Sequence, residues 1–312
     1  MLVNVPDAEE LNGIALRLYF DAWGRTVSLM SDFGMVFETV FDGNGKPQIY
    51  VDEWNDYLIQ AQPEMGAICA TIQHSAELRL KSIICQVSPY LLLLDGNFSF
   101  RANSQNDIDF ADQRTLDAVD LPRAVRTLTA FDIPDSYVES YGKLRQRRNR
   151  VTHLGTHEGG LTPNELVRIM GEQYVSLWPD GRWLVRRVQF DGNRATRFFH
   201  DGRYSSAHST VMEELPYTMV LLDNGTFKKA FGISKGKLKG FCPGCVFNLA
   251  SKVDFGREPT AYRTGKSSGK CAMCDRLLLI HKEDDECPSC QSHERVEGEG
   301  FQGSVCFSCG DG

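Results

Sequence analysis

The sequence lacks an apolar run long enough to cross a membrane. A membrane-spanning helix needs roughly 18–20 consecutive apolar residues, whereas the longest candidate run here is the short segment Tyr90 to Leu94. The N-terminal residues MLVNVPDAEE also lack the basic and then apolar pattern of a signal peptide. We therefore expect a soluble cytoplasmic protein that has no membrane partner.

The chain also lacks an excess of positive charge. Its 312 residues include 41 Asp and Glu against 34 Lys and Arg, which gives a formal net charge of -7. Taken alone, this balance argues against a protein coated in basic charge for polyanions. The acidic surplus is local, however, because residues 1–60 hold ten Asp and Glu and only three Lys and Arg. In the rest of the chain positive and negative charges are equal in number, so the net charge does not exclude a basic segment there.

Several common catalytic motifs are missing as well. The sequence has no HExxH motif, no paired Asp cluster and no nucleophile elbow, so a metal-dependent hydrolase is poorly supported. The segment GKSSGK at 265–270 does not satisfy the phosphate-loop pattern GxxxxGK[ST], and we interpret it as a flexible loop.

Cysteine, by contrast, is abundant and regularly spaced. Two thiolates three positions apart can wrap one cation, and two such CxxC pairs complete a closed, tetrahedral four-sulfur zinc site. Eight of the ten cysteines form four such pairs in the last 71 residues, namely Cys242/Cys245, Cys271/Cys274, Cys287/Cys290 and Cys306/Cys309. The sequence therefore predicts two structural Zn²⁺ ions and no catalytic metal. A secreted disulfide framework would need a signal sequence, and a thioredoxin-type redox pair would need one CxxC that opens a helix.

The four CxxC motifs can be paired in two ways. Sequential pairing joins the first to the second across 25 residues and the third to the fourth across 15, and we favour it because the shorter gap suits a zinc ribbon. A nested alternative joins the second to the third across 12 residues, with RLLLIHK as a ribbon strand. Cys69 and Cys85 lie in an apolar helical pattern and are expected in the core, while His281 and His293 are expected on the surface.

Residues 1–175 are predicted to form a helical bundle. Apolar residues at spacings of three and four mark a long helix that begins at Pro63 and ends at Ser88-Pro89. On this helix Glu77 and Lys81 lie one turn apart and can pair. Capping residues or a proline in the first turn mark the starts of three later helices, near Asp120, Ser136 and Thr162.

Two further regions follow the bundle. Residues 176–240 are predicted to form a small antiparallel β-meander and a basic linker, because Asp-Gly or Asn-Gly pairs recur at 180, 191, 201 and 224 between short runs of β-forming residues. Residues 241–312 are predicted to form a tandem zinc-ribbon module. The expected fold class is therefore mainly α, with a helical bundle, a small β region and a C-terminal zinc-ribbon module.

The basic segment KLRQRRNRVTHLG at 143–155 holds the residues best suited to chemistry. On a helix, Asn149 and His153 are four apart and share a face, and Arg148 lies about 100° to one side. The imidazole can move a proton at near-neutral pH, the guanidinium can bind phosphate through two hydrogen bonds, and the amide can orient the imidazole. This set can cleave RNA without a metal. Neighbours expected to contact RNA are Lys143, Arg145, Arg147 and Arg150. The alternative interpretation is a solvated basic helix end that the helix dipole favours.

Residues 8 to about 175 resemble the HEPN family, the higher eukaryotes and prokaryotes nucleotide-binding domains. In that family an Arg-Asn-x-x-x-His motif lies near the end of a late helix, which Arg148-Asn149-x-x-x-His153 matches, and HSAELRLKSII is similar to the family's long second helix. The resemblance implies a metal-independent endoribonuclease with Arg148, Asn149 and His153 as catalytic residues. It also implies a homodimer with a composite cleft, products with 2′,3′-cyclic phosphate and 5′-hydroxyl ends, and a regulated role as a toxin or in antiviral defence.

A second class of function is a non-catalytic adaptor. In this alternative the zinc ribbons bind nucleic acid or protein, and the HEPN-like bundle is a dimerisation platform. Strands rich in aromatic residues that could stack on bases are scarce, apart from the positions of Phe241, Phe247 and Phe307. A regulatory protein or a nucleic-acid trigger is a possible partner besides RNA.

Overall fold

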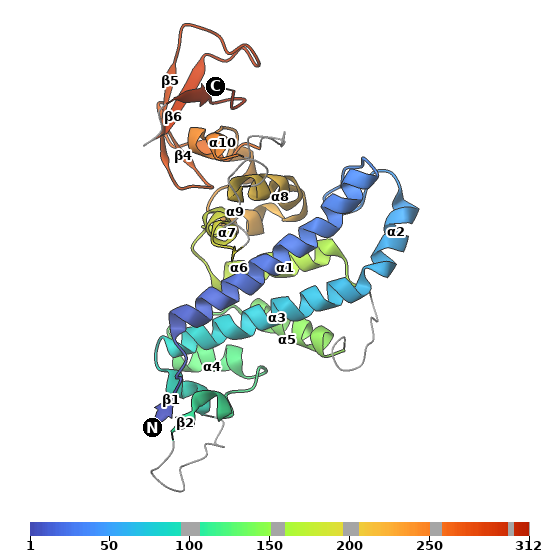
Figure 1. The fold of residues 1–312 in the computed structure, drawn as a ribbon, viewed down its shortest axis with the longest axis vertical. Helices are drawn as coiled ribbons and strands as arrows, with labels where there is room; N and C mark the ends of the chain where they lie inside the picture. The colour runs from blue at the N-terminus through green and yellow to red at the C-terminus, as the bar shows by residue number, and fades with distance from the viewer. Residues whose placement is uncertain (95–106, 151–159, 196–205, 250–257, 299–302, 312) are drawn as a thin grey trace. The chain divides into compact units, whose positions relative to one another are not determined.

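The computed structural model describes residues 1–94, 107–150, 160–195, 206–249, 258–298 and 303–311. Figure 1 shows a largely helical chain that ends in a β-sheet. The chain forms two compact units, the first made of Met1–Phe33 with Tyr50–Leu177 and the second of Gly34–Ile49 with Trp178–Gly312. Within the described residues, no helix combines the length and apolar character that a membrane span requires.

The first unit is a helical bundle with one short parallel strand pair. Its elements are β1 (Leu2–Val3), α1 (Ala8–Val36, which ends in the second unit), α2 (Val51–Gln60), α3 (Gln62–Cys85), the 3-10 helix η1 (Pro89–Leu93), β2 (Ile108–Asp109), the 3-10 helix η2 (Phe110–Asp112), α4 (Leu121–Leu128), α5 (Asp135–Asn149) and α6 (Pro163–Leu177). β1 pairs with β2, with Leu2 opposite Ile108.

Helix α3 is the centre of this bundle and confirms the predicted long apolar helix. It packs against α4, α5 and α6, and Met65, Ile68 and Ile72 on it are fully buried. The buried Ser75 hydroxyl donates to the Ala15 carbonyl of α1 at 2.7 Å and accepts from Gln173 Nε2 of α6 at 3.3 Å. Apolar burial and this polar bridge together hold α1, α3 and α6 in one layered core.

The predicted helix starts agree with the structure to different degrees. Thr162 caps α6 as expected, because its Oγ1 accepts from the Glu165 backbone N–H at 3.2 Å. Asp120 precedes α4, but its side chain makes no capping hydrogen bond. The capping box expected at Ser136 is wrong, because α5 begins one residue earlier and Pro134 precedes it.

The β-meander predicted for residues 176–240 is wrong for the described part of that region, which is helical. It contains α7 (Trp183–Gly192), α8 (Ala207–Leu221), α9 (Asn224–Phe231) and the 3-10 helix η5 (Lys235–Lys237). The Asp-Gly and Asn-Gly pairs mark helix boundaries here instead of hairpins. Gly181 has a φ of 65° in the turn before α7, and Asp223 caps α9 by accepting from the backbone N–H of Gly225 at 2.8 Å. The pair at 201 lies outside the described residues.

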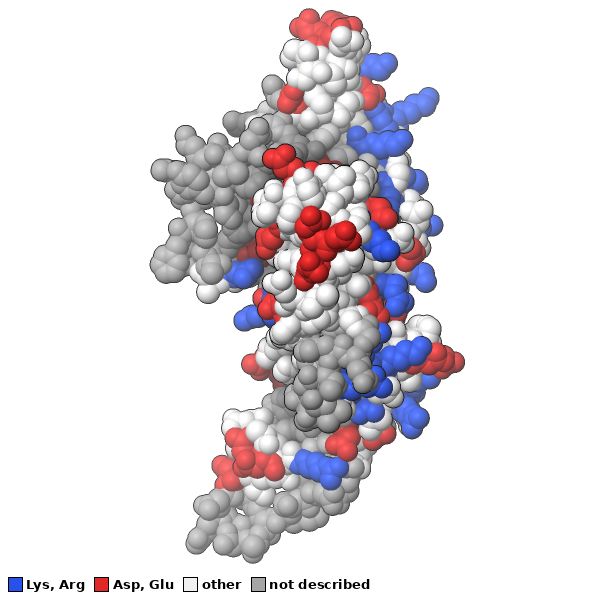
Figure 2. Space-filling view, turned by 90° about the vertical axis from the view of Figure 1, so that its right-hand side faces the viewer, with Lys and Arg blue, Asp and Glu red and all other residues white. Residues whose placement is uncertain are grey.

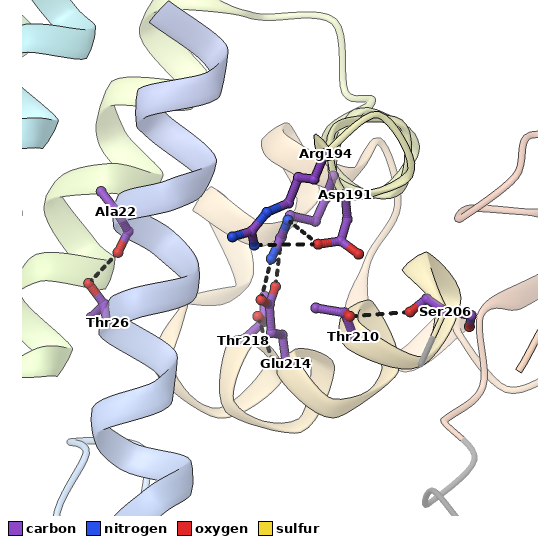
Figure 3. A network of polar contacts seen from close by, with 9 residues as sticks. Ala22, Thr26, Asp191, Arg194, Ser206, Thr210, Glu214 and Thr218 are labelled. Carbon is purple, nitrogen blue, oxygen red and sulfur yellow. Dashed lines mark hydrogen bonds and ion pairs between the residues drawn. The ribbon is translucent and has the colours of Figure 1, made fainter. Parts of the chain in front are cut away.

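A buried ion pair joins α7 to α8 in the second unit. Arg187 is 1% exposed, and its Nε lies 2.8 Å from Glu214 Oε2 while its Nη2 lies 2.5 Å from Oε1. Asp191 Oδ1 lies 3.8 Å from Arg187 Nη1 and 3.7 Å from Arg194 Nη1. Figure 3 shows Asp191, Arg194 and Glu214 converging on this point. The two cations and two carboxylates balance each other inside the unit.

The C-terminal sheet is antiparallel and follows chain order. After α10 (Pro243–Phe247) come β3 (Ala261–Arg263), β4 (Ser268–Cys271), β5 (Leu277–Lys282), β6 (Glu294–Gly298) and β7 (Ser304–Cys306), paired in the order β3-β4-β5-β6-β7. Ile280 pairs with Val296, and both are buried, whereas Leu277 and Leu279 are 62% and 56% exposed. One face of the sheet therefore packs inward and the other faces solvent. Gly240 must be glycine because a Cβ there would lie 2.1 Å from the Phe307 ring.

We predict that Glu214→Leu destabilises the protein by roughly 3–5 kcal/mol, because it leaves the buried Arg187 without its bidentate partner. The double variant Arg187→Met/Glu214→Leu should recover most of this loss. Urea unfolding followed by circular dichroism measures both values. The control is Arg186→Met, which breaks the more exposed pair with Asp180 and should cost only about 0–1 kcal/mol. Equal losses for Glu214→Leu and the control would contradict the prediction.

Candidate functional site

The end of α5 carries the first two residues of the predicted catalytic set. Arg148 and Asn149 are its last two residues, and the chain continues one further residue to Arg150 before the described segment ends. His153, the third member, lies outside the described residues. Arg148 and Asn149 are therefore consecutive residues at the end of a helix.

Arg148 is anchored to α3 by an ion pair with Glu77. The distance from Arg148 Nη2 to Glu77 Oε1 is 3.1 Å, and the side chains are 27% and 18% exposed. Gln73 Nε2 also donates to Glu77 Oε1, at 3.3 Å. Glu77 is thus paired across two helices and not with Lys81, whose Nζ instead donates to Thr115 Oγ1 at 3.2 Å. The sequence separation of 71 residues between Arg148 and Glu77 left no local signal for this pair.

Tyr141 fixes α5 about two turns before Arg148. Its hydroxyl donates to the Ala118 carbonyl at 2.8 Å. Burial raises the pKa of Tyr141 well above its usual value, and the negative charge of Glu77 acts in the same direction. The phenol therefore stays neutral, which makes it a fixed support for the helix and not an acid or base at neutral pH.

The other basic residues of α5 divide between two surroundings. Lys143, Arg147 and Arg150 line a groove between α5 and α6. Arg145 is half-buried, and its Nε is enclosed without a hydrogen-bond partner among the described residues. Figure 2 shows a face of the molecule on which both basic and acidic side chains are exposed. The basic residues near the end of α5 differ in exposure, because Lys143 and Arg150 are exposed whereas Arg145 is half-buried.

The eight paired cysteines form two separate four-sulfur clusters, with the sequential grouping that we favoured. In each cluster the four sulfur atoms lie within 4.8 Å of one another. The members are Cys242, Cys245, Cys271 and Cys274 in the first cluster and Cys287, Cys290, Cys306 and Cys309 in the second. The nested alternative is therefore wrong.

The spacing of the sulfurs fits a tetrahedral zinc site. Sulfurs at about 2.3 Å from a tetrahedral zinc ion lie roughly 3.8 Å apart. In the first cluster the Cys242–Cys274 and Cys245–Cys271 sulfur distances are 3.7 and 3.6 Å. In the second cluster the Cys287–Cys309 and Cys290–Cys306 sulfur distances are both 3.5 Å. Each cluster could therefore hold one structural zinc ion.

Local backbone geometry brings the sulfurs of the first cluster together. Cys242 immediately precedes α10, Cys245 lies within it, and Cys271 ends β4. The turn after Cys271 closes through Asp275, which has a φ of 64° and donates its N–H to the Cys271 carbonyl at 3.0 Å. Hydrogen bonds from the neighbouring thiols hold the pKa of Cys274 well below its usual range. The neighbouring thiols raise the pKa of Cys245 and burial raises the pKa of Cys271, so within this cluster Cys274 is the residue that most favours the thiolate form that binds zinc.

The two clusters differ in exposure. Three cysteines of the first are buried, whereas Cys290 of the second is exposed. His281 and His293 belong to neither cluster, because their Nε2 atoms lie 3.4 Å from Glu283 Oε1 and 3.5 Å from Glu286 Oε1. The expectation that both lie on the surface holds for His293, which is exposed, whereas His281 is half-buried.

Comparison with protein-family models, with curated proteins and with solved structures finds no match to this chain. The resemblance to the HEPN family therefore rests on the residues of the sequence alone. The chain is a mainly helical protein with a C-terminal antiparallel five-strand sheet that carries two four-cysteine clusters.

We expect each cluster to lose its metal independently. Because both cysteines of each CxxC motif are needed to complete the four-sulfur coordination shell, Cys271→Ser and Cys306→Ser should each lower the zinc content by one ion per chain. Inductively coupled plasma mass spectrometry of the purified protein measures this. Cys69→Ala is the matched control, because Cys69 lies in α3 and outside both clusters. Unchanged zinc in both serine variants would contradict the prediction.

Cys69 and Cys85 are predicted to resist thiol reagents in the folded protein. They are 0% and 8% exposed, and burial raises the pKa of each to about 11. At pH 8 only about 0.1% of such a thiol is ionised. Iodoacetamide labelling read by peptide mass spectrometry should therefore find both unmodified until denaturant is added. After chelation of the metal, Cys290 should react first because it is exposed.

Proposed function

We propose that this protein is a metal-independent endoribonuclease. The observation that carries the proposal is the placement of Arg148, which is held at the end of α5 by Glu77 and followed directly by Asn149. These two residues begin the Arg-Asn-x-x-x-His motif that His153 completes. An anchored guanidinium with free N–H groups is suited to bind a phosphate, because Glu77 contacts only one of its donors in the described geometry.

The proposed reaction uses the RNA ribose as the nucleophile. The 2′-oxygen forms a bond to the adjacent phosphorus while the bond from phosphorus to the 5′-oxygen breaks. One imidazole accepts the 2′-hydroxyl proton and another donates a proton to the leaving oxygen, and His153 of each subunit in a homodimer supplies these two roles. Arg148 stabilises the added negative charge on the phosphoryl oxygens, and Asn149 orients the imidazole. The products are a 2′,3′-cyclic phosphate and a 5′-hydroxyl.

The proposal assigns the two cysteine clusters a structural task. Each holds one Zn²⁺ with a complete four-sulfur shell, which leaves no position open to substrate. The zinc-ribbon module then binds a trigger, a regulatory protein or RNA, in keeping with a cytoplasmic toxin or antiviral defence effector whose activity is regulated.

A second candidate function is a non-catalytic adaptor that binds through its zinc ribbons. The observation in its favour is the exposed face of the five-strand sheet, where Leu277 and Leu279 are 62% and 56% exposed on β5. Exposed leucines that alternate along one strand are typical of a surface that contacts a partner. In this case the helical bundle serves as a platform for dimerisation.

We predict that the purified protein cleaves mixed RNA in EDTA and that His153→Ala lowers the rate at least about a hundredfold, in line with the loss of a general acid–base group. Gel analysis gives the rate, and end-group analysis of the products detects the cyclic phosphate. Zinc content is measured before and after EDTA, so that loss of the structural ions is not confused with loss of catalysis. Glu77→Gln should lower the rate less, because it removes only the anchor of Arg148.

His74→Ala provides the matched control, because His74 is an exposed histidine of the same unit on α3. It should cleave as the wild type does. Equal cleavage by His153→Ala and wild type would assign the activity to a contaminant and overturn the proposal. RNA binding that persists in Arg148→Ala, with no cleavage by any variant in the presence or absence of ribbon-binding partners, would favour the adaptor.

A further inference from the structure

We propose that the groove between α5 and α6 binds the phosphate backbone of the RNA strand. This inference rests on the proposed function and names a part of the substrate path that the catalytic motif does not include. The lining residues that matter are Lys143, Gln146 and Arg147 from α5, Arg150 directly after it, and Glu165 and Arg168 from α6. The basic segment of the sequence already contains Lys143, Arg147 and Arg150, whereas Arg168 joins them only through the packing of the two helices.

The groove has a positive charge that its own carboxylate does not neutralise. Four cations and one carboxylate line it. The carboxylate belongs to Glu165, which already forms an ion pair with Arg147, with 2.5 Å between Glu165 Oε1 and Arg147 Nη1. Lys143 and Arg150 contact no carboxylate among the described residues, and both are exposed. Their charges are therefore available to an anion from solvent.

Arg168 contributes a cation from the opposite wall of the groove. It is 61% exposed, and its Nη1 lies 3.1 Å from Glu172 Oε1 one turn along α6. An exposed pair of this kind contributes little to stability, so a phosphate can replace Glu172 as the partner of Arg168 at little cost. The Ser140 hydroxyl donates a hydrogen bond to Glu172 Oε2 at 2.7 Å. Glu172 keeps this hydrogen bond when Arg168 turns to a phosphate.

The spacing of the α5 cations matches a polyanion better than a single anion. Lys143, Arg147 and Arg150 lie four and three residues apart and therefore on one helix face. At 1.5 Å per residue the row extends roughly 10 Å, whereas stacked nucleic-acid strands carry a phosphate about every 3.4 Å along the axis. The row can thus contact on the order of three successive phosphates.

The size and lining of the groove favour a strand over other anionic ligands. Its volume of about 190 Å³ is below the roughly 300–1,000 Å³ of pockets for free small molecules. Only Leu144 and Ile169 add apolar groups to the lining, and Leu144 is 3% exposed. An acidic protein segment would need buried apolar anchors for a stable contact, so the groove is better suited to a sugar-phosphate chain.

The groove is also distinct from the anchored guanidinium. Arg148 points to Glu77 on α3, while its neighbour Arg147 points to Glu165 on α6. Helix α5 therefore presents two adjacent basic faces. One face holds a guanidinium at the proposed scissile phosphate, and the other holds the strand that leads to it.

The test measures binding separately from cleavage. The probe is a fluorescein-labelled single-stranded oligonucleotide with 2′-O-methyl groups throughout, which lacks the attacking hydroxyl and stays intact. Fluorescence anisotropy with the full-length protein is recorded between 50 and 200 mM salt. Lys143→Gln/Arg168→Gln should weaken binding roughly tenfold at low salt and reduce the slope of log K against log salt by about 1.4, since single-stranded contacts contribute about 0.7 each.

The matched control is Arg17→Gln/Arg123→Gln, which removes two exposed arginines of the same unit from α1 and α4. Binding by this variant should stay within about twofold of wild type. No RNA binding by the wild type, or equal losses in the two double variants, would overturn the groove proposal. A polyglutamate peptide that binds more tightly than RNA and needs Lys143 and Arg168 would also overturn it and assign the groove to an acidic protein.

Cleavage of unmodified RNA is recorded with the same proteins. If the wild type binds through the groove but never cleaves, the groove stands and the ribonuclease proposal fails. If cleavage depends on His153 but Lys143→Gln/Arg168→Gln binds like the control, the ribonuclease stands and the groove proposal fails.

Discussion

The convergence of four sulfurs at each of two points is the constraint on which the C-terminal sheet depends. Its strands are only three to six residues long, and strands this short bury too little apolar surface to fix a sheet alone. The first cluster joins the end of β4 to α10, and the second joins the end of β7 to the turn before β6. Metal binding at these points would therefore supply folding free energy that the small core lacks.

The helical unit depends on burial around α3, and its described residues hold no four-cysteine cluster. Two polar residues of α3, Ser75 and Glu77, contact different neighbouring helices. Ser75 is buried and ties α1 to α6, whereas Glu77 is part-exposed and faces α5. One side of α3 is thus packed in the core, and another side carries a carboxylate that binds a neighbouring helix. Such a helix is a rigid support that can position a functional side chain.

The sequence predicted features that depend on local spacing and missed features that depend on packing. The CxxC motifs and the apolar stripe of α3 repeat at short intervals, so their structures followed directly. The Asp-Gly pairs at α7 and the Asn-Gly pair at α9 led to a wrong prediction because such dipeptides suit both a hairpin and a helix boundary. The apolar burial of Trp183 and Phe227 on these helices decides between the two. Glu77 and Arg168 acquire their roles only from neighbouring helices, which no local pattern encodes.

If Arg148 binds the scissile phosphate as proposed, Glu77 positions it and leaves part of its guanidinium open to the substrate. A fully buried partner would hold the guanidinium too firmly, as the Arg187–Glu214 pair illustrates with side chains 2% and 8% exposed. The Arg148–Glu77 pair is 27% and 18% exposed, so solvent screens it and rearrangement costs less. A phosphate can accept two parallel hydrogen bonds from the guanidinium edge that Glu77 leaves open. The carboxylate then serves to reduce the conformational freedom of Arg148 before substrate arrives, and this preorganisation is what a charge-stabilising group at a reacting phosphate requires.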